Sequence, residues 1–186
     1  MQRITFRVYP RRKRRKRPAL AAAALLLSTA LAGCGGGASK RSGATQRVAG
    51  AGFTFAVPGG WQVSRAPRSV VVKRGSGPTL ASVTILSLRK RYRPALFQQA
   101  ARELDQVTDA LAAKLGGKVI ARRSLVVAGR SVRQYDVTYE RGGSGLVDRI
   151  TYVLRGTSEY YLLCRWPADE GEPSACALLT DTFRLR

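Results

Sequence analysis

The chain has 186 residues, of which 33 are Lys or Arg and 11 are Asp or Glu, so its formal net charge is +22. It contains no histidine, which excludes Ser-His-Asp and Cys-His catalysis and most zinc sites, because each needs an imidazole. The length predicts one domain with an additional terminal segment.

Residues 1–33 have the layout of an export segment. A basic run, Arg11 to Arg17, precedes 14 small and apolar residues, Ala19 to Ala32, which is shorter than the roughly 20 residues of a membrane-spanning helix. Leu31-Ala32-Gly33-Cys34 then resembles the lipobox of bacterial lipoproteins, in which a signal peptidase cuts before a lipid-modified cysteine. The resemblance implies that residues 1–33 are removed and that Cys34 carries a lipid (palmitate is one expected acyl group), anchoring the chain at the extracytoplasmic face of the cell membrane.

Two other interpretations of this segment remain open. A plain signal peptide cut elsewhere and an uncleaved short anchor would both show a basic end and an apolar run. The general secretory and twin-arginine export routes also stay open.

Charge is unevenly distributed along the chain. Nine of the 33 basic residues precede Cys34 and all 11 acidic residues follow it, so the chain from Cys34 onward carries +13. This charge favours anionic partners such as lipid headgroups, wall polymers or an envelope protein, although a GC-rich genome could account for part of it. Nucleic acid is a common partner of basic domains, but export argues against it.

Residues 34–49 are predicted to form a flexible tether, because their Gly, Ser and basic residues show no apolar periodicity. A coil of this length spans about 20 Å. The pattern becomes regular afterwards, and residues 50–186 are predicted to form one domain.

Alternating apolar residues predict a series of strands in that domain: 53–57, 61–64, 70–73, 80–88, 119–127, 131–140, 146–154 and 159–166. Short turns separate the last four, including one at Arg155 to Ser158, which predicts an antiparallel meander. Both faces of 80–88 are apolar or small, as expected of a sheet covered on both sides.

Two helices are predicted. Apolar residues recur at steps of three and four from Pro94 to Leu115, and Gly116-Gly117 supplies a helix stop. A shorter helix is expected from Ser174 to Phe183, with Cys176, Leu179 and Phe183 on one side.

Cys164 and Cys176 remain as a pair once Cys34 is assigned to lipid. Each shares a face with large apolar neighbours, so we expect a disulfide between a strand and the final helix. Two buried free thiols, or a redox or metal role, are the alternatives.

Charged clusters give two candidate sites. Arg89, Lys90, Arg91 and Arg93 surround Tyr92 and are a candidate surface for an anionic headgroup or polymer; a solvated loop is the alternative. Asp169-Glu170-Gly171-Glu172 has calcium-binding oxygens but no ordered ligand spacing, which favours a solvated loop. No catalytic motif stands out, and we expect no catalytic residues, no bound metal and no cofactor.

The order of these elements resembles the PsbP-like family. The matching pieces are Phe53 to Trp61, Val126 to Arg130 and Leu178 to Phe183. The resemblance implies an α+β fold in which helices sandwich an antiparallel β-sheet. It also implies a binding or accessory role without catalysis.

The sequence thus favours a non-catalytic module of the cell envelope. A carrier of a lipid or another small apolar ligand is the first alternative, and it would need a pocket beneath the helix at 94–115. A cell-wall enzyme is the least favoured alternative. It would need a cleft with converging carboxylates of raised pKa.

Overall fold

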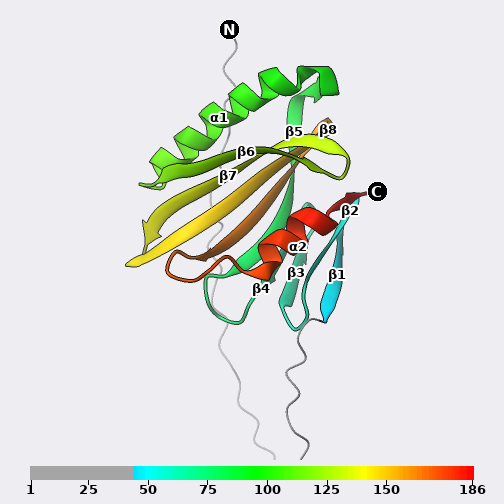
Figure 1. Cartoon of the computed structure of the whole chain (residues 1–186). Helices are drawn as coiled ribbons and strands as arrows, with labels where there is room; N and C mark the ends of the chain where they lie inside the picture. Colours follow the sequence, from blue (N-terminus) through cyan, green and yellow to red (C-terminus); the bar gives the residue numbers. More distant parts are fainter. Residues whose placement is uncertain (1–43) are drawn as a thin grey trace, which may run out of the picture. The chain divides into compact units, whose positions relative to one another are not determined.

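The computed structural model describes residues 44–186. The predicted signal segment, the lipid-attachment residue Cys34 and residues 34–43 of the predicted tether therefore lie outside the described residues. The described chain is an α+β fold made mostly of antiparallel strands, with two α-helices and two sheets (Figure 1). Within it, no helix combines the length and apolarity needed to cross a membrane.

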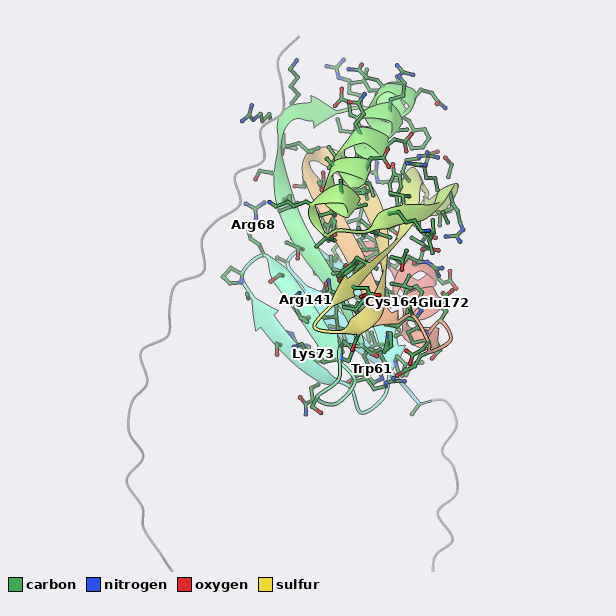
Figure 2. All side chains as sticks on the ribbon, turned by 90° about the vertical axis from the view of Figure 1, so that its left-hand side faces the viewer. Trp61, Arg68, Lys73, Arg141, Cys164 and Glu172 are labelled. Atoms are coloured by element: carbon green, nitrogen blue, oxygen red, sulfur yellow. A yellow bond between two sulfur atoms is a disulfide. The ribbon has the colours of Figure 1, made fainter. Side chains whose placement is uncertain are left out.

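The larger sheet has six strands in the order β3-β4-β5-β8-β7-β6, and every neighbouring pair is antiparallel. Its strands are β3 (Gln62–Ala66), β4 (Ser69–Lys73), β5 (Leu80–Tyr92), β6 (Lys118–Val127), β7 (Arg130–Arg141) and β8 (Ser144–Pro167). Arg68 lies in the turn between β3 and β4, and Lys73 is the last residue of β4 (Figure 2). The predicted meander of the later strands is confirmed for β6, β7 and β8.

The smaller sheet has the order β1-β2-β9 and consists of β1 (Thr45–Gly50), β2 (Phe53–Pro58) and β9 (Arg184–Leu185). Strand β1 corrects the predicted tether, because residues 45–49 belong to the fold. In β1, Val48 is buried and lies opposite Phe55 of β2. One apolar residue gives no alternation to read in the sequence, so pairing with β2 makes this segment a strand.

The long predicted helix is confirmed. A single turn, η1 (Pro94–Leu96), leads into α1 (Phe97–Lys114), and Gly116 at φ +71° stops the helix. The helix packs on β6 and β7 through Ala101, Thr108 and Ala112, which are its buried residues. Leu104, Leu111 and Leu115, which belong to the apolar stripe expected from the sequence, are partly buried and pack against the same core.

The second predicted helix is also confirmed, as α2 (Ser174–Thr182). It packs on β2 and β8, on the face of the sheet opposite α1. The two faces of the larger sheet are thus covered differently. One faces α1, and the other faces α2 together with the small sheet, a second layer that the sequence did not predict.

Each face carries its own apolar core. Under α1 lies a cluster of seven buried residues, which are Ala112, Tyr135, Val137, Tyr139, Leu146, Ile150 and Tyr152. The other core is larger and includes Phe53, Phe55, Val83, Leu162 and Phe183. Both faces of the larger sheet therefore bury side chains, as the pattern of 80–88 predicts.

Strand β8 corrects the turn predicted at Arg155 to Ser158, because it runs unbroken over 24 residues. Leu146, Ile150 and Tyr152 face α1, whereas beyond Gly156 it is Tyr161 and Leu163 that do so. The residues of β8 that face α1 are therefore even-numbered before Gly156 and odd-numbered after it. This change means that one residue is inserted as a bulge. Gly156 is at φ +57°, and a Gly-Thr-Ser sequence is typical of both a turn and such a bulge.

A disulfide joins Cys164 of β8 to Cys176 of α2, with their Cα atoms 5.4 Å apart. This confirms the predicted bond between a strand and the final helix. Figure 2 shows Cys164 beside α2, with Glu172 on the loop that leads into the helix.

Candidate functional site

Two adjoining depressions lie where the ends of several strands meet. One has a volume of about 620 Å³ and is lined by residues of the β6–β7 hairpin, the end of α2 and β9. The other, of about 560 Å³, is lined by the end of β5, η1 and the bulged part of β8. Arg130 and Arg155 line both, so the two depressions form one continuous surface, which we call the arginine groove.

Local backbone geometry positions the two shared arginines. Ala128 and Gly129 form the hairpin turn at φ +50° and +71°, which matches the two left-handed positions of a tight hairpin turn. Arg130 follows as the first residue of β7. Arg155 directly precedes the bulge at Gly156, which ends the regular alternation of β8 beside the groove.

The pairing between β5 and β8 is interrupted at the same place. Ser87 lies opposite Ser158, but the next registered pair is Tyr92 with Gly156. Several residues of β5 thus stand against a single residue of β8, and the space so created is the second depression. Arg91 lines it from the β5 side.

The basic residues at 89–93, which could have formed a loop, lie mostly in a strand. Arg89, Lys90 and Arg91 are exposed residues of strand β5, and Arg93 precedes η1. Of these four, Arg91 lines the groove. Their role in binding stays a prediction.

Sequence reasoning missed Arg130, Arg155 and Arg184, which line the groove from β7, β8 and β9. Each stands beside a turn or bulge and is separated from the basic run by many residues. Glycine next to arginine, as at Gly129-Arg130 and Arg155-Gly156, is a local signal. Only the sheet register brings these residues together.

The groove arginines contrast with the arginines that bind carboxylates. The ion pairs of residues 44–186 involve Arg74, Arg122, Arg123, Arg133, Arg149 and Arg165. None of them involves Arg91, Arg130, Arg155 or Arg184. Asp181 also lines the larger depression, but within this part of the chain no ion pair joins it to these four arginines.

The pKa of Tyr92 is influenced by the charge of a groove arginine. Burial raises the pKa of its phenol, while the positive charge of Arg130 acts in the opposite direction. The opposing effect of Arg130 means that its guanidinium lies close enough to influence Tyr92.

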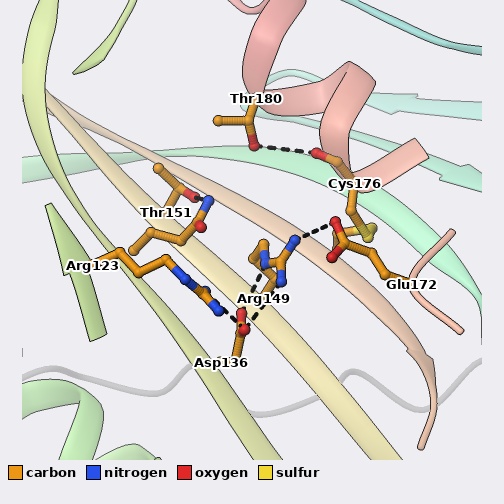
Figure 3. A network of polar contacts seen from close by, with 9 residues as sticks. Arg123, Asp136, Arg149, Thr151, Glu172, Cys176 and Thr180 are labelled. Carbon is orange, nitrogen blue, oxygen red and sulfur yellow. Dashed lines mark hydrogen bonds and ion pairs between the residues drawn. A yellow bond between two sulfur atoms is a disulfide. The ribbon is translucent and has the colours of Figure 1, made fainter. Parts of the chain in front are cut away.

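Asp136, in the middle of β7, is held by two arginines (Figure 3). Arg149 donates to it at 2.8 and 3.0 Å, and Arg123 at 2.8 Å. Burial raises the pKa of Asp136, but these hydrogen bonds outweigh burial and the pKa is lowered overall. Arg149 also pairs with Glu172, so the predicted acidic loop is fastened to the sheet through an ion pair.

Asp148 of β8 and Asp105 of α1 are two further carboxylates with arginine partners. Asp148 accepts hydrogen bonds from Arg165 at 2.6 and 2.8 Å and from the Tyr139 hydroxyl at 3.2 Å. Asp105 of α1 accepts from Arg133 and from the Tyr135 hydroxyl, both at 2.7 Å. Burial raises the pKa of Asp105, yet these bonds lower it overall. Both carboxylates therefore connect different parts of the fold.

Glu159 differs from these carboxylates. It is 5% exposed and faces the α1 side of β8, and burial raises its pKa to about 7. No hydrogen bond to its carboxylate is present in the described part of the chain, and it lines neither depression. It therefore forms no converging pair of carboxylates of the kind that acid-base catalysis uses.

A metal site finds no support in residues 44–186, where no group of three or more His, Cys, Asp or Glu side chains could hold an ion. In the predicted acidic loop, Glu170 instead pairs with Arg74.

No protein family model matches the chain, and no curated protein matches it. A protein from Bacteroides thetaiotaomicron shares its fold, with a TM-score of 0.53 and 10% identity over 73% of this chain and 45% of that chain. The present chain thus spans less than half the length of that protein. LpqN, involved in cell envelope biogenesis of Mycobacterium tuberculosis, has a TM-score of 0.45 at 14% identity, covering 78% of this chain and 87% of its own. PA94 of Pseudomonas aeruginosa, a protein of unknown function, has a TM-score of 0.38 at 20% identity, covering 66% and 83%.

Proposed function

We propose that this protein is a lipoprotein of the cell envelope, anchored through Cys34 at the extracytoplasmic face of the membrane. Its PsbP-like domain acts there as a non-catalytic binding or accessory module for an anionic partner. The lipobox-like sequence supports the anchor. The tether and domain after Cys34 lie beside an anionic surface, which suits their positive charge.

The observation that carries the binding role is the division of the arginines into two sets. One set holds carboxylates, as Arg149 holds Asp136 and Arg165 holds Asp148. The other set lines the arginine groove, and although Asp181 lines it too, these arginines form no ion pair in the described part of the chain. Arginine that is not used in an internal ion pair is available to bind an external anion.

A carrier of apolar ligands has less support. Neither depression is lined by a residue of α1, and apolar side chains such as Tyr135, Val137 and Ile150 fill the contact between α1 and the sheet. An enzyme has less support again, because Glu159, the carboxylate whose pKa is raised, stands apart from both depressions.

Capture of partners from envelope membranes tests the proposal. The variant changes Arg89, Lys90, Arg91 and Arg93 to Gln, and a control with the same loss of charge changes Lys73, Arg102, Lys118 and Arg141, which are exposed and line neither depression. We expect the wild type and the control to retain the same envelope component and the variant to lose it. Equal capture by all three proteins would rule out the basic run as the binding surface.

A further inference from the structure

We propose that the arginine groove binds the headgroup of an anionic phospholipid, with the phosphodiester held by Arg91, Arg130 and Arg155. This inference rests on the proposed function, because it names the site and the class of partner for a module that works beside a membrane.

Three strands far apart in the sequence bring these arginines to one place. Arg91 comes from the end of β5, Arg130 from the start of β7 and Arg155 from the bulge of β8, and all three line the same depression of about 560 Å³. The hydroxyl-bearing residues Thr157 and Ser158 line it as well. Forked guanidinium donors with hydroxyl groups beside them match the oxygens of a phosphate.

The donors of Arg155 are only partly used within the protein. Its Nη1 donates to the backbone oxygen of Arg186 at 2.8 Å, which holds the side chain at the boundary between the two depressions. The remaining nitrogens of the guanidinium provide further donors. Arg155 is thereby positioned before a ligand arrives, which lowers the entropic cost of binding.

The shape of the groove favours a phosphodiester over an isolated phosphate. A phosphodiester has a substituent on each side of the phosphorus. The two depressions share Arg130 and Arg155, so a phosphate at these residues would have space on either side for both substituents.

Apolar residues beside the arginines favour a lipid over a polymer. The larger depression is also lined by Val126, Ala128 and Leu185. Val126 is 70% exposed, the highest value among the large apolar residues that stand exposed in the described part. It is the last residue but one of β6 and stands beside the hairpin that carries Arg130. An exposed apolar side chain next to arginines is the combination that inserts at the boundary between headgroups and acyl chains.

The test compares two ligands that share glycerol phosphate and differ in acyl chains. The full chain, labelled with ¹⁵N, is titrated with dihexanoylphosphatidylglycerol below its micellar concentration and, separately, with an oligomer of glycerol phosphate. Amide shifts at Arg130, Gly156 and Thr157 locate binding in the groove and separate it from any binding by the basic run at Arg11 to Arg17. We expect saturable shifts at these amides, with about tenfold tighter binding of the lipid.

Variants identify the groups responsible. Arg130→Gln combined with Arg155→Gln is expected to weaken lipid binding by at least about tenfold, as expected when charged hydrogen bonds are lost. Arg102→Gln combined with Arg141→Gln removes the same charge outside the groove and is expected to stay within about twofold of the wild type. Val126→Ser is expected to reduce the preference for the lipid over the polymer.

Each contrary result has a defined meaning. Equal or tighter binding of the polymer would overturn the lipid assignment. Absence of shifts at the groove amides, or equal loss in the control, would overturn the site. The envelope component captured through Arg89, Lys90, Arg91 and Arg93 separates the two proposals. If either contrary result is found while the wild type still captures that component, the proposed function stands and this inference alone fails.

Discussion

Single residues in this domain show how burial and pairing set the state of a carboxylate. Asp136 and Asp105 are held ionised by arginines, and their pKa values are lowered despite burial. Glu159 has no such partner in the described residues, and burial raises its pKa to about 7. A carboxylate of this kind makes the stability of the fold depend on pH.

Burial of Glu159 predicts that the stability of the fold depends on pH. Its pKa in the folded state exceeds the ordinary value of 4.5, so it adds stability that is fully present below about pH 4.5 and lost as pH rises through about 7. The chain contains no histidine that would titrate in the same window. We therefore expect Glu159→Gln to raise the free energy of unfolding at pH 8 by about 2 kcal/mol and to flatten its change between pH 5 and 8.

Urea unfolding at a series of pH values measures this effect. Glu140→Gln, which changes an exposed carboxylate of β7, is the control and is expected to keep the wild-type profile. A Glu159→Gln protein whose stability varies with pH as the wild type does would show that Glu159 is not the titrating group.

At the scale of elements, the bulge in β8 is the feature that shapes both the fold and the groove. It changes which residues face α1, it lies where the pairing with β5 is interrupted, and it places Arg155 in the same groove as Arg130. Gly156 permits it because φ +57° is open to glycine at little cost.

Substitution of Gly156 tests the bulge. Gly156→Ala adds a Cβ at a left-handed position and is expected to lower the free energy of unfolding by about 1–2 kcal/mol. The surroundings of Gly156 are open, so backbone strain is the cause and not a clash. Gly171→Ala, at an open position without a positive φ, is the control. Equal stability of the two variants in urea unfolding would contradict the role assigned to the bulge.

Local sequence patterns predicted the strands and helices with strong apolar periodicity, and they also predicted the disulfide. Phe53 to Val57 alternates, the residues from Pro94 to Leu115 repeat as in a helix, and Cys164 can pair with Cys176. Strand β1 escaped prediction because Val48 is its only buried residue. The β8 bulge escaped because turns and bulges use the same residues, and the choice between them depends on pairing with β5.

At the scale of the whole molecule, the candidate site could be predicted only in part. The basic run drew attention to Arg91, but Arg130 and Arg155 join it through the order of strands in the sheet. The excess of positive charge was visible in the composition. Which arginines form ion pairs, however, depends on which carboxylates the fold places within reach of each one.

The central claim is that the module works while anchored to a membrane through Cys34. Its most direct test is the share of the protein that sediments with membranes, measured for the wild type and for Cys34→Ser in cells of the source organism. We predict that the wild type is found in the membrane fraction and that Cys34→Ser is released from it, because a lipidated cysteine provides the anchor. A Cys34→Ser protein that stays with the membranes to the same extent would contradict the account.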